Sequence, residues 1–196
     1  WAWVACAAVP LRALAQSDVA LDRYEPAPAD AHLLTVADPS VAGSSRLFAG
    51  YMLSFAHSPL RVRAGDSTLG NPVEHQLVLH GLVALDIARR VRVALDVPML
   101  LNQSGSSPND GRVQLDSPHG QAWGDLRLSG YYAALRQAKF VPAAALGFSA
   151  WLPSGDDKAF AGAGQLRWSA EAVLGGDHGA WLWRVSIGRR HQSSDS

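Results

Sequence analysis

The stretch 77–99, LVLHGLVALDIARRVRVALDVPM, decides the fold class. In residues 91–99 every odd position is apolar, whereas Arg92 and Asp96 stand at even positions. In its first half the odd positions are again apolar apart from Gly81, and His80 and Asp86 stand at even positions. Because successive side chains of a strand point to opposite faces, this period of two predicts two strands, each with an apolar and a polar face.

The same alternation recurs along most of the chain. It covers the segments 47–55, 77–87, 91–99, 124–134, 140–152, 166–174 and 181–188. These make about seven strands, most of about ten residues. Strands of globular proteins average about 5 to 6 residues, whereas strands that cross an outer membrane have about 9 to 11. Strand length therefore favours a membrane-spanning barrel.

The segments between these strands alternate in length. Residues 60–74, 102–123 and 153–164 are long and polar, whereas 88–90, 136–139 and 175–179 are short. Outer-membrane barrels have short periplasmic turns and long external loops. We predict an all-β fold, an antiparallel up-and-down transmembrane β-barrel. Bacterial barrels close an even number of strands, so about seven predict an incomplete barrel with an open edge that lipid cannot satisfy.

Composition excludes several other classes. The 17 Lys+Arg balance the 17 Asp+Glu, so the net charge of +0 gives no field that would attract nucleic acid. Disorder is excluded because 48% of the residues are hydrophobic and only 17% are charged. Few charges with neutral mean hydropathy are expected when lipid-facing and lumen-facing residues alternate.

The N-terminal residues predict export. The apolar run 1–9 followed by Ala13-Leu14-Ala15 is typical of the end of a signal peptide, so we expect 1–15 to be its remnant. A buried N-terminal helix or strand is the alternative. The sole cysteine, Cys6, lies in this segment, so the exported chain would have no disulfide. Residues 16–46 are rich in Pro and Ala, which predicts an extended or plug-like periplasmic leader. Residues 47–196 would be the partial barrel.

Charged residues recur on the second face of adjacent predicted strands. In a barrel they point into a polar lumen, where arginines and carboxylates pair or line a water path. In a soluble, half-exposed sheet they would form the solvated face instead. The candidate lumen residues are Arg92, Asp96, Arg127, Arg167, Glu171 and Arg184.

Aromatic residues gather near the predicted strand ends. Two aromatic belts at the headgroup level are typical of a barrel surface, although any one such side chain is more often a core residue. The candidate interface aromatics are Trp123 and Trp151 near the outer ends, and Phe140, Trp181 and Trp183 near the inner ends.

The sequence offers no set of residues that indicates catalysis. There is no nucleophile elbow, P-loop or dinucleotide fingerprint. His75 and His80 are five residues apart, which places them on opposite faces of a strand, and the seven histidines show no metal-ligand spacing. We therefore assign no catalytic, cofactor or metal residues and expect no enzyme activity.

Five short motifs, in this order, resemble an established family. They are LDRYEP at 21–26, EHQL at 74–77, VP at 97–98, GDLRL at 124–128 and LPSG at 152–155. Together they resemble the N-terminal barrel of OmpA-family outer-membrane proteins of the myxobacterial, delta-proteobacterial type. The resemblance covers about residues 19–190. It implies an outer-membrane location, contact with lipid, and a C-terminal peptidoglycan-binding domain that would not lie within these residues.

Our first hypothesis is therefore an outer-membrane barrel protein that acts as a structural envelope component, a small-solute pore or both. The second is a secreted or periplasmic β-sandwich binding module, with one face of the strands buried against a second sheet. A barrel-embedded hydrolase or acyltransferase is a third class, and it would need a Ser-His-acid set that the sequence does not show.

Overall fold

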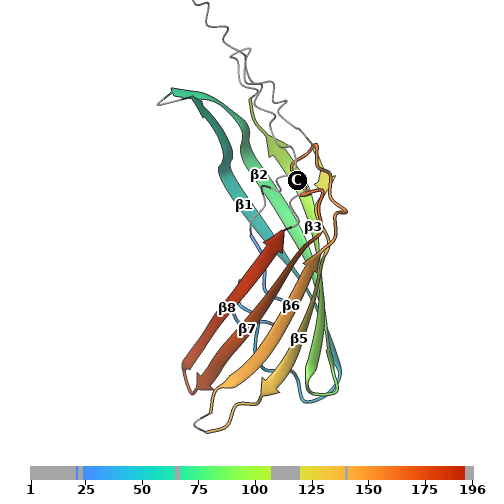
Figure 1. The fold of residues 1–196 in the computed structure, drawn as a ribbon, viewed down its shortest axis with the longest axis vertical. Coiled ribbons are helices and arrows are strands. Elements are labelled where there is room, and N and C mark those ends of the chain that lie inside the picture. The colour runs from blue at the N-terminus through green and yellow to red at the C-terminus, as the bar shows by residue number, and fades with distance from the viewer. Residues whose placement is uncertain (1–20, 22–23, 65–66, 107–119, 140, 193–196) are drawn as a thin grey trace, which may run out of the picture.

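The computed structural model describes residues 21, 24–64, 67–106, 120–139 and 141–192. These residues form one curled antiparallel sheet (Figure 1). Its strands are β1 (Arg46–Ala64), β2 (Ser67–Ile87), β3 (Val91–Ser104), β4 (Ala122–Trp123), β5 (Arg127–Leu135), β6 (Ala143–Trp151), β7 (Arg167–His178) and β8 (Trp181–Gln192). Each long strand pairs with the next along the chain, and the two-residue β4 pairs with β3 alone. The predicted all-β, up-and-down architecture is confirmed.

The sheet curls without closing on itself. Within the described residues β1 pairs only with β2 and β8 only with β7, so both remain edges. The molecule is thus an incomplete barrel of seven long strands, as the alternation predicted. The part of the chain that the structure describes contains no helix that is long and apolar enough to cross a membrane.

The connections fall into two groups at opposite ends of the sheet (Figure 1). Residues 88–90, 136–142 and 179–180 form short turns, whereas 105–126 and 152–166 are long. One predicted long loop is wrong. Residues 60–74 mostly continue β1 and β2, which reach 19 and 21 residues and project beyond the other strands. Beyond 57 and 75 the two strands remain paired, through several register shifts, as far as Ala64 opposite Ser67, and this pairing keeps the hairpin in strand conformation.

The two faces of the sheet have opposite character. Alternation turns large apolar side chains to the convex face, where Tyr51 is 84% exposed and Ile187 77% exposed. This convex band also includes Leu53, Phe55, Val83, Leu85, Val93, Leu95, Leu128, Tyr132, Leu146, Phe148, Trp168, Leu174 and Val185. On the concave face the buried side chains are mainly polar or small. Water-soluble sheets bury the apolar face, so the polarity here is inverted.

Residues 24–45, which we call the strap, run along the concave face without joining the sheet, and a turn at 29–30 lets the backbone N–H of Ala27 donate to the carbonyl of Leu34 at 2.8 Å. Ala29 packs against Leu82, Ala84 and Ala94. Farther along the strap, Ala37 packs against Tyr131 and Val173. Pro26 and Pro39 are fully buried. Prolines keep the strap from pairing as a strand, and its small alanines fit the narrow space. The predicted signal remnant, 1–15, lies outside the described residues.

The strap spans the sheet from end to end. Leu21, just before it, donates a backbone hydrogen bond to the carbonyl of Phe160 in the 152–166 connection, 3.1 Å away. The other end of the strap leads into β1 at the end that carries the short turns. The described part of the predicted periplasmic leader is therefore packed within the curve of the sheet and is not a free segment.

Candidate functional site

The candidate site is the polar concave face together with the strap. Alternation places all six candidate lumen residues on this face. Arg92, Asp96 and Arg127 are buried, and the others are at least partly covered. The register of the paired strands then decides which of these side chains lie opposite each other.

The β2–β3 hairpin brings Asp86 opposite Arg92. The guanidinium donates from Nε to Asp86 Oδ1 at 2.6 Å and from Nη2 to Oδ2 at 3.0 Å. The backbone N–H of Ala42 in the strap also donates to Oδ2, at 2.7 Å. Both side chains of the pair are fully buried, where an ionised group requires a partner. Asp86 lies on the predicted polar face but is not among the candidate lumen residues. Counting back across the three-residue turn would have paired it with Arg92.

A second chain of contacts crosses β2, β3 and β5. His80 Nδ1 lies 3.1 Å from Asp96 Oδ1, and Arg127 Nη2 lies 3.2 Å from Asp96 Oδ2. Arg127 also donates to the carbonyl of Pro26 in the strap. Asp96 and Arg127 are direct cross-strand partners, so their pairing follows from register. His80 is buried on the concave face, whereas His75 is exposed on the convex face, opposite to it.

Asp125 ties the 152–166 connection to the sheet. Its Oδ1 accepts from the backbone of Gly155 at 3.1 Å, and its Oδ2 accepts from Ala163 at 2.9 Å and from Arg167 Nη2 at 3.1 Å. Gly155 and Gly162 of this connection lie so close together that a Cβ on Gly155 would be 2.7 Å from Gly162 Cα. Only glycines allow this approach, and it closes one end of the concave face.

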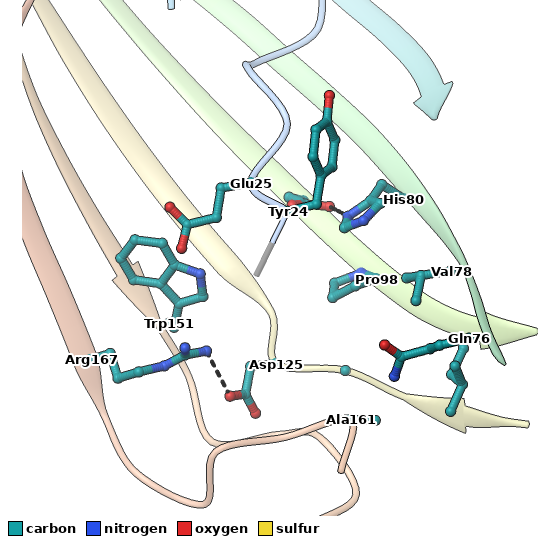
Figure 2. A pocket seen from close by; sticks show the side chains of 13 residues that line it. Tyr24, Glu25, Gln76, Val78, His80, Pro98, Asp125, Trp151, Ala161 and Arg167 are labelled. Carbon is teal, nitrogen blue, oxygen red and sulfur yellow. Dashed lines mark hydrogen bonds and ion pairs between the residues drawn. The ribbon is translucent and has the colours of Figure 1, made fainter. Parts of the chain in front are cut away.

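A cavity of about 40 Å³ lies at this end. Figure 2 shows Arg167 pointing toward Asp125, and Trp151, Tyr24 and Glu25 line the same cavity. A cavity of this volume has room for water and is too small for an organic solute. A larger cavity of about 350 Å³ lies beside the strap toward β8, where it meets the serines of β6 to β8 and the side chains of Glu171 and Tyr131.

Trp151 contradicts one prediction. It is 6% exposed and lies on the concave face, so it cannot belong to an outer aromatic belt. The guanidinium carbons of Arg190, Arg167 and Arg127 lie 5.0, 5.5 and 6.0 Å from the centre of its ring. Its position in the alternation of β6, two residues after Ser149, already indicated the inward face.

The other candidate interface aromatics differ in position. Trp181 and Trp183 lie on the convex face of β8 at the short-turn end, and they are 80% and 41% exposed. Trp123 is exposed in β4, near the long connections. Phe140 lies outside the described residues.

The strap and the concave face have complementary charges. The strap carries the acids Glu25, Asp30 and Asp38 and no lysine or arginine. Each acid meets an arginine of the sheet: Glu25 contacts Arg190, Asp30 Oδ2 lies 3.8 Å from Arg92 Nη2, and Asp38 Oδ1 lies 2.5 Å from Arg184 Nε. These acids could not be selected from the sequence, because residues 24–45 show no strand periodicity.

One titratable group of the strap is shifted. The hydrogen bond from His32 Nδ1 to the carboxylate of Asp38 raises the pKa of His32, and the negative charge of that carboxylate adds to the effect. Arg184 opposes the shift from the other side of Asp38. Protonation of His32 thus strengthens a contact that shapes the strap.

Among the described residues, the charges of the concave face are largely paired. Within the described ranges no three His, Cys, Asp or Glu side chains come together as metal ligands. Comparison with family models, with curated proteins and with solved structures gave no match to this chain.

Proposed function

We propose that this chain is an outer-membrane β-barrel protein of the OmpA type, which serves as a structural envelope component with a largely occupied lumen. The inverted polarity of the sheet carries this proposal. The described residues leave the convex band uncovered and place the buried charges on the concave face. Lipid would cover the convex band, and the paired charges would line the lumen.

The five motifs that resemble OmpA-family barrels support the family assignment by where they lie. Tyr24, Gln76, Pro98 and Asp125 come from four of them and line the same 40 Å³ cavity (Figure 2). The fifth motif, 152–155, reaches Asp125 through the backbone of Gly155. Motifs scattered over the chain therefore meet at one junction between strap, sheet and connection.

The strap favours a structural role over an open pore. It extends along the concave face and engages Arg92, Arg127, Arg184 and Arg190. A lumen filled in this way would pass only small solutes, through the space that remains beside the strap. The 350 Å³ cavity is the largest part of that space whose lining we describe.

Membrane partition tests the proposal. The chain is refolded with detergent, mixed with phosphatidylcholine vesicles and floated on a density gradient. We expect it to float with the vesicles through its convex band. The open edges of β1 and β8 should leave it more easily extracted by carbonate than a closed barrel. A monodisperse monomer in detergent-free buffer that stays at the bottom of the gradient would overturn the proposal and favour a soluble β-sandwich.

Conductance tests the role of the strap. Glu25→Gln, Asp30→Asn and Asp38→Asn together remove the charges that meet the arginines. In planar bilayers we expect this triple variant to conduct more than the unmodified chain. Glu74→Gln, which alters a carboxylate outside the strap, is the control and should conduct like the unmodified chain. Equal conductance of the triple variant would show that the strap does not restrict the lumen.

A further inference from the structure

We propose that His57 and His75 bind a divalent first-row transition cation of the Zn²⁺ or Cu²⁺ class. The two residues are direct cross-strand partners in β1 and β2. Both share the convex face with Phe55 and Leu77, and His75 lies opposite Ser104, the last residue of β3, so the hairpin projects beyond β3 from this point. The site is thus separate from the concave face, and the inference does not depend on the proposed function.

The distance between the imidazoles fits a shared metal ion. The two Nδ1 atoms lie 3.2 Å apart, and the ring centres are 4.9 Å apart. A cation bonded to both nitrogens at about 2.05 Å would make an N–metal–N angle of about 100°. This lies between the angles of tetrahedral and square-planar coordination, which Zn²⁺ and Cu²⁺ prefer.

The surroundings hold the two rings in place. Phe55 stacks on His75 with the ring centres 5.8 Å apart. Directly after His57 the register shifts, and Ser58 has a φ of 51°. Bulges of this kind re-aim the neighbouring side chain and are frequent beside functional sites.

A carboxylate stands behind one of the imidazoles. Glu74 Oε1 lies 3.9 Å from His75 Nε2, the ring nitrogen that faces away from His57. Metal-binding histidines usually donate their second N–H to a carboxylate, which orients the ring and strengthens the ligand. A small rotation of the exposed Glu74 side chain would make that hydrogen bond.

Two protein ligands leave coordination positions open. No third His, Cys, Asp or Glu joins the pair among the residues that the structure describes. Water or a donor from another molecule would complete the shell, as in metal sites that exchange ligands. The exposed pair therefore suits a modest, exchangeable site that links β1 to β2. Sequence spacing could not reveal it, because the partners are 18 residues apart on different strands.

The test is calorimetric titration of the folded full chain with ZnCl₂ and CuCl₂. Cys6→Ser is the background, so that the thiol does not compete. We expect one site, which Glu74→Gln weakens about tenfold and which His57→Gln or His75→Gln weakens more. His178→Gln is the matched control, because it removes an exposed histidine whose cross-strand partner is Trp181.

Paramagnetic resonance of the Cu²⁺ complex reads the ligands directly. The unmodified chain should show coupling to two imidazole nitrogens, and each single variant of the pair should show one. Circular dichroism confirms that each variant is folded. The proposal is overturned if the chain binds neither ion, if His57→Gln and His75→Gln bind like the unmodified chain, or if His178→Gln loses as much affinity as they do.

Discussion

Asp86 and Arg92 face each other across the β2–β3 turn, and their pairing is the most completely buried ionic contact that we describe. Replacing Asp86 with Asn leaves the guanidinium without its bidentate partner and deprives Ala42 of a charged acceptor. We expect Asp86→Asn to lower the free energy of unfolding by about 3 kcal/mol. Urea titration in micelles measures the change.

Asp177→Asn is the matched control for that prediction. Asp177 contacts Arg184 at 2.6 Å but its side chain is 51% exposed, so water compensates for the lost pair. We expect its cost to stay below about 1 kcal/mol. Equal costs for the two variants would show that the burial of Asp86 is not what makes its pairing important.

The turn between β2 and β3 is strained at two residues. Ala88 and Arg89 have φ values of 50° and 65°, and Arg90 donates to the carbonyl of Ile87 at 3.2 Å. This backbone suits Asn-Gly, whereas other residues lose free energy in the left-handed region. We expect Ala88→Asn with Arg89→Gly to raise the unfolding free energy by about 1 kcal/mol. Arg90→Gly, outside the left-handed pair, should lower it instead.

At the scale of elements, the strap should respond to pH through His32. The pKa of His32 is raised in the folded chain, so its contact with Asp38 contributes fully below the unfolded pKa of about 6.5. The contribution is lost as pH rises through the higher folded pKa. Unfolding free energies measured from pH 5.5 to 8.5 should therefore show His32→Gln to be destabilising at the acidic end only. A constant difference between the two proteins across this range would contradict the linkage.

The convex band gives an element-scale prediction in β6. Leu146 stands at the centre of that strand and is 59% exposed. In lipid, Leu146→Arg should weaken insertion by about 2 to 4 kcal/mol, the cost of such a charge near the bilayer midplane. Leu146→Phe keeps the surface apolar and should insert normally. A soluble sheet would tolerate the arginine without loss, and vesicle flotation distinguishes the two outcomes.

Strands were predictable from sequence wherever one face had to be apolar. The alternation in 91–99 and 124–134 identified β3 and β5 and placed Arg92 and Arg127 on the polar face. It did not find the pairing of Glu25 with Arg190, because that contact joins residues 165 apart and one of them lies in a segment without periodicity. It also mistook 60–74 for a loop, since the turn-forming residues there do not prevent extended pairing.

At the scale of the whole molecule, the proposed function requires that lipid, and not water or a second sheet, covers the convex face. The apolar residues there are uncovered in the described chain, and the concave charges are paired with the strap. A barrel in lipid accounts for both features, whereas a sandwich accounts for the first only if a second sheet covers the band. The pairing of the strands would be the same in a barrel and in a sandwich, so it does not distinguish the two.

A nitroxide scan of 168–174 in β7, with the chain in lipid vesicles and Cys6 replaced by serine, tests this claim most directly. If lipid covers the convex face, labels at Trp168, Ala170 and Ala172 will be accessible to oxygen and shielded from a water-soluble nickel complex. Labels at Ser169 and Glu171 will show less oxygen and more nickel accessibility. Accessibilities that rise and fall together along the strand, or low values of both on the convex face, would contradict the account.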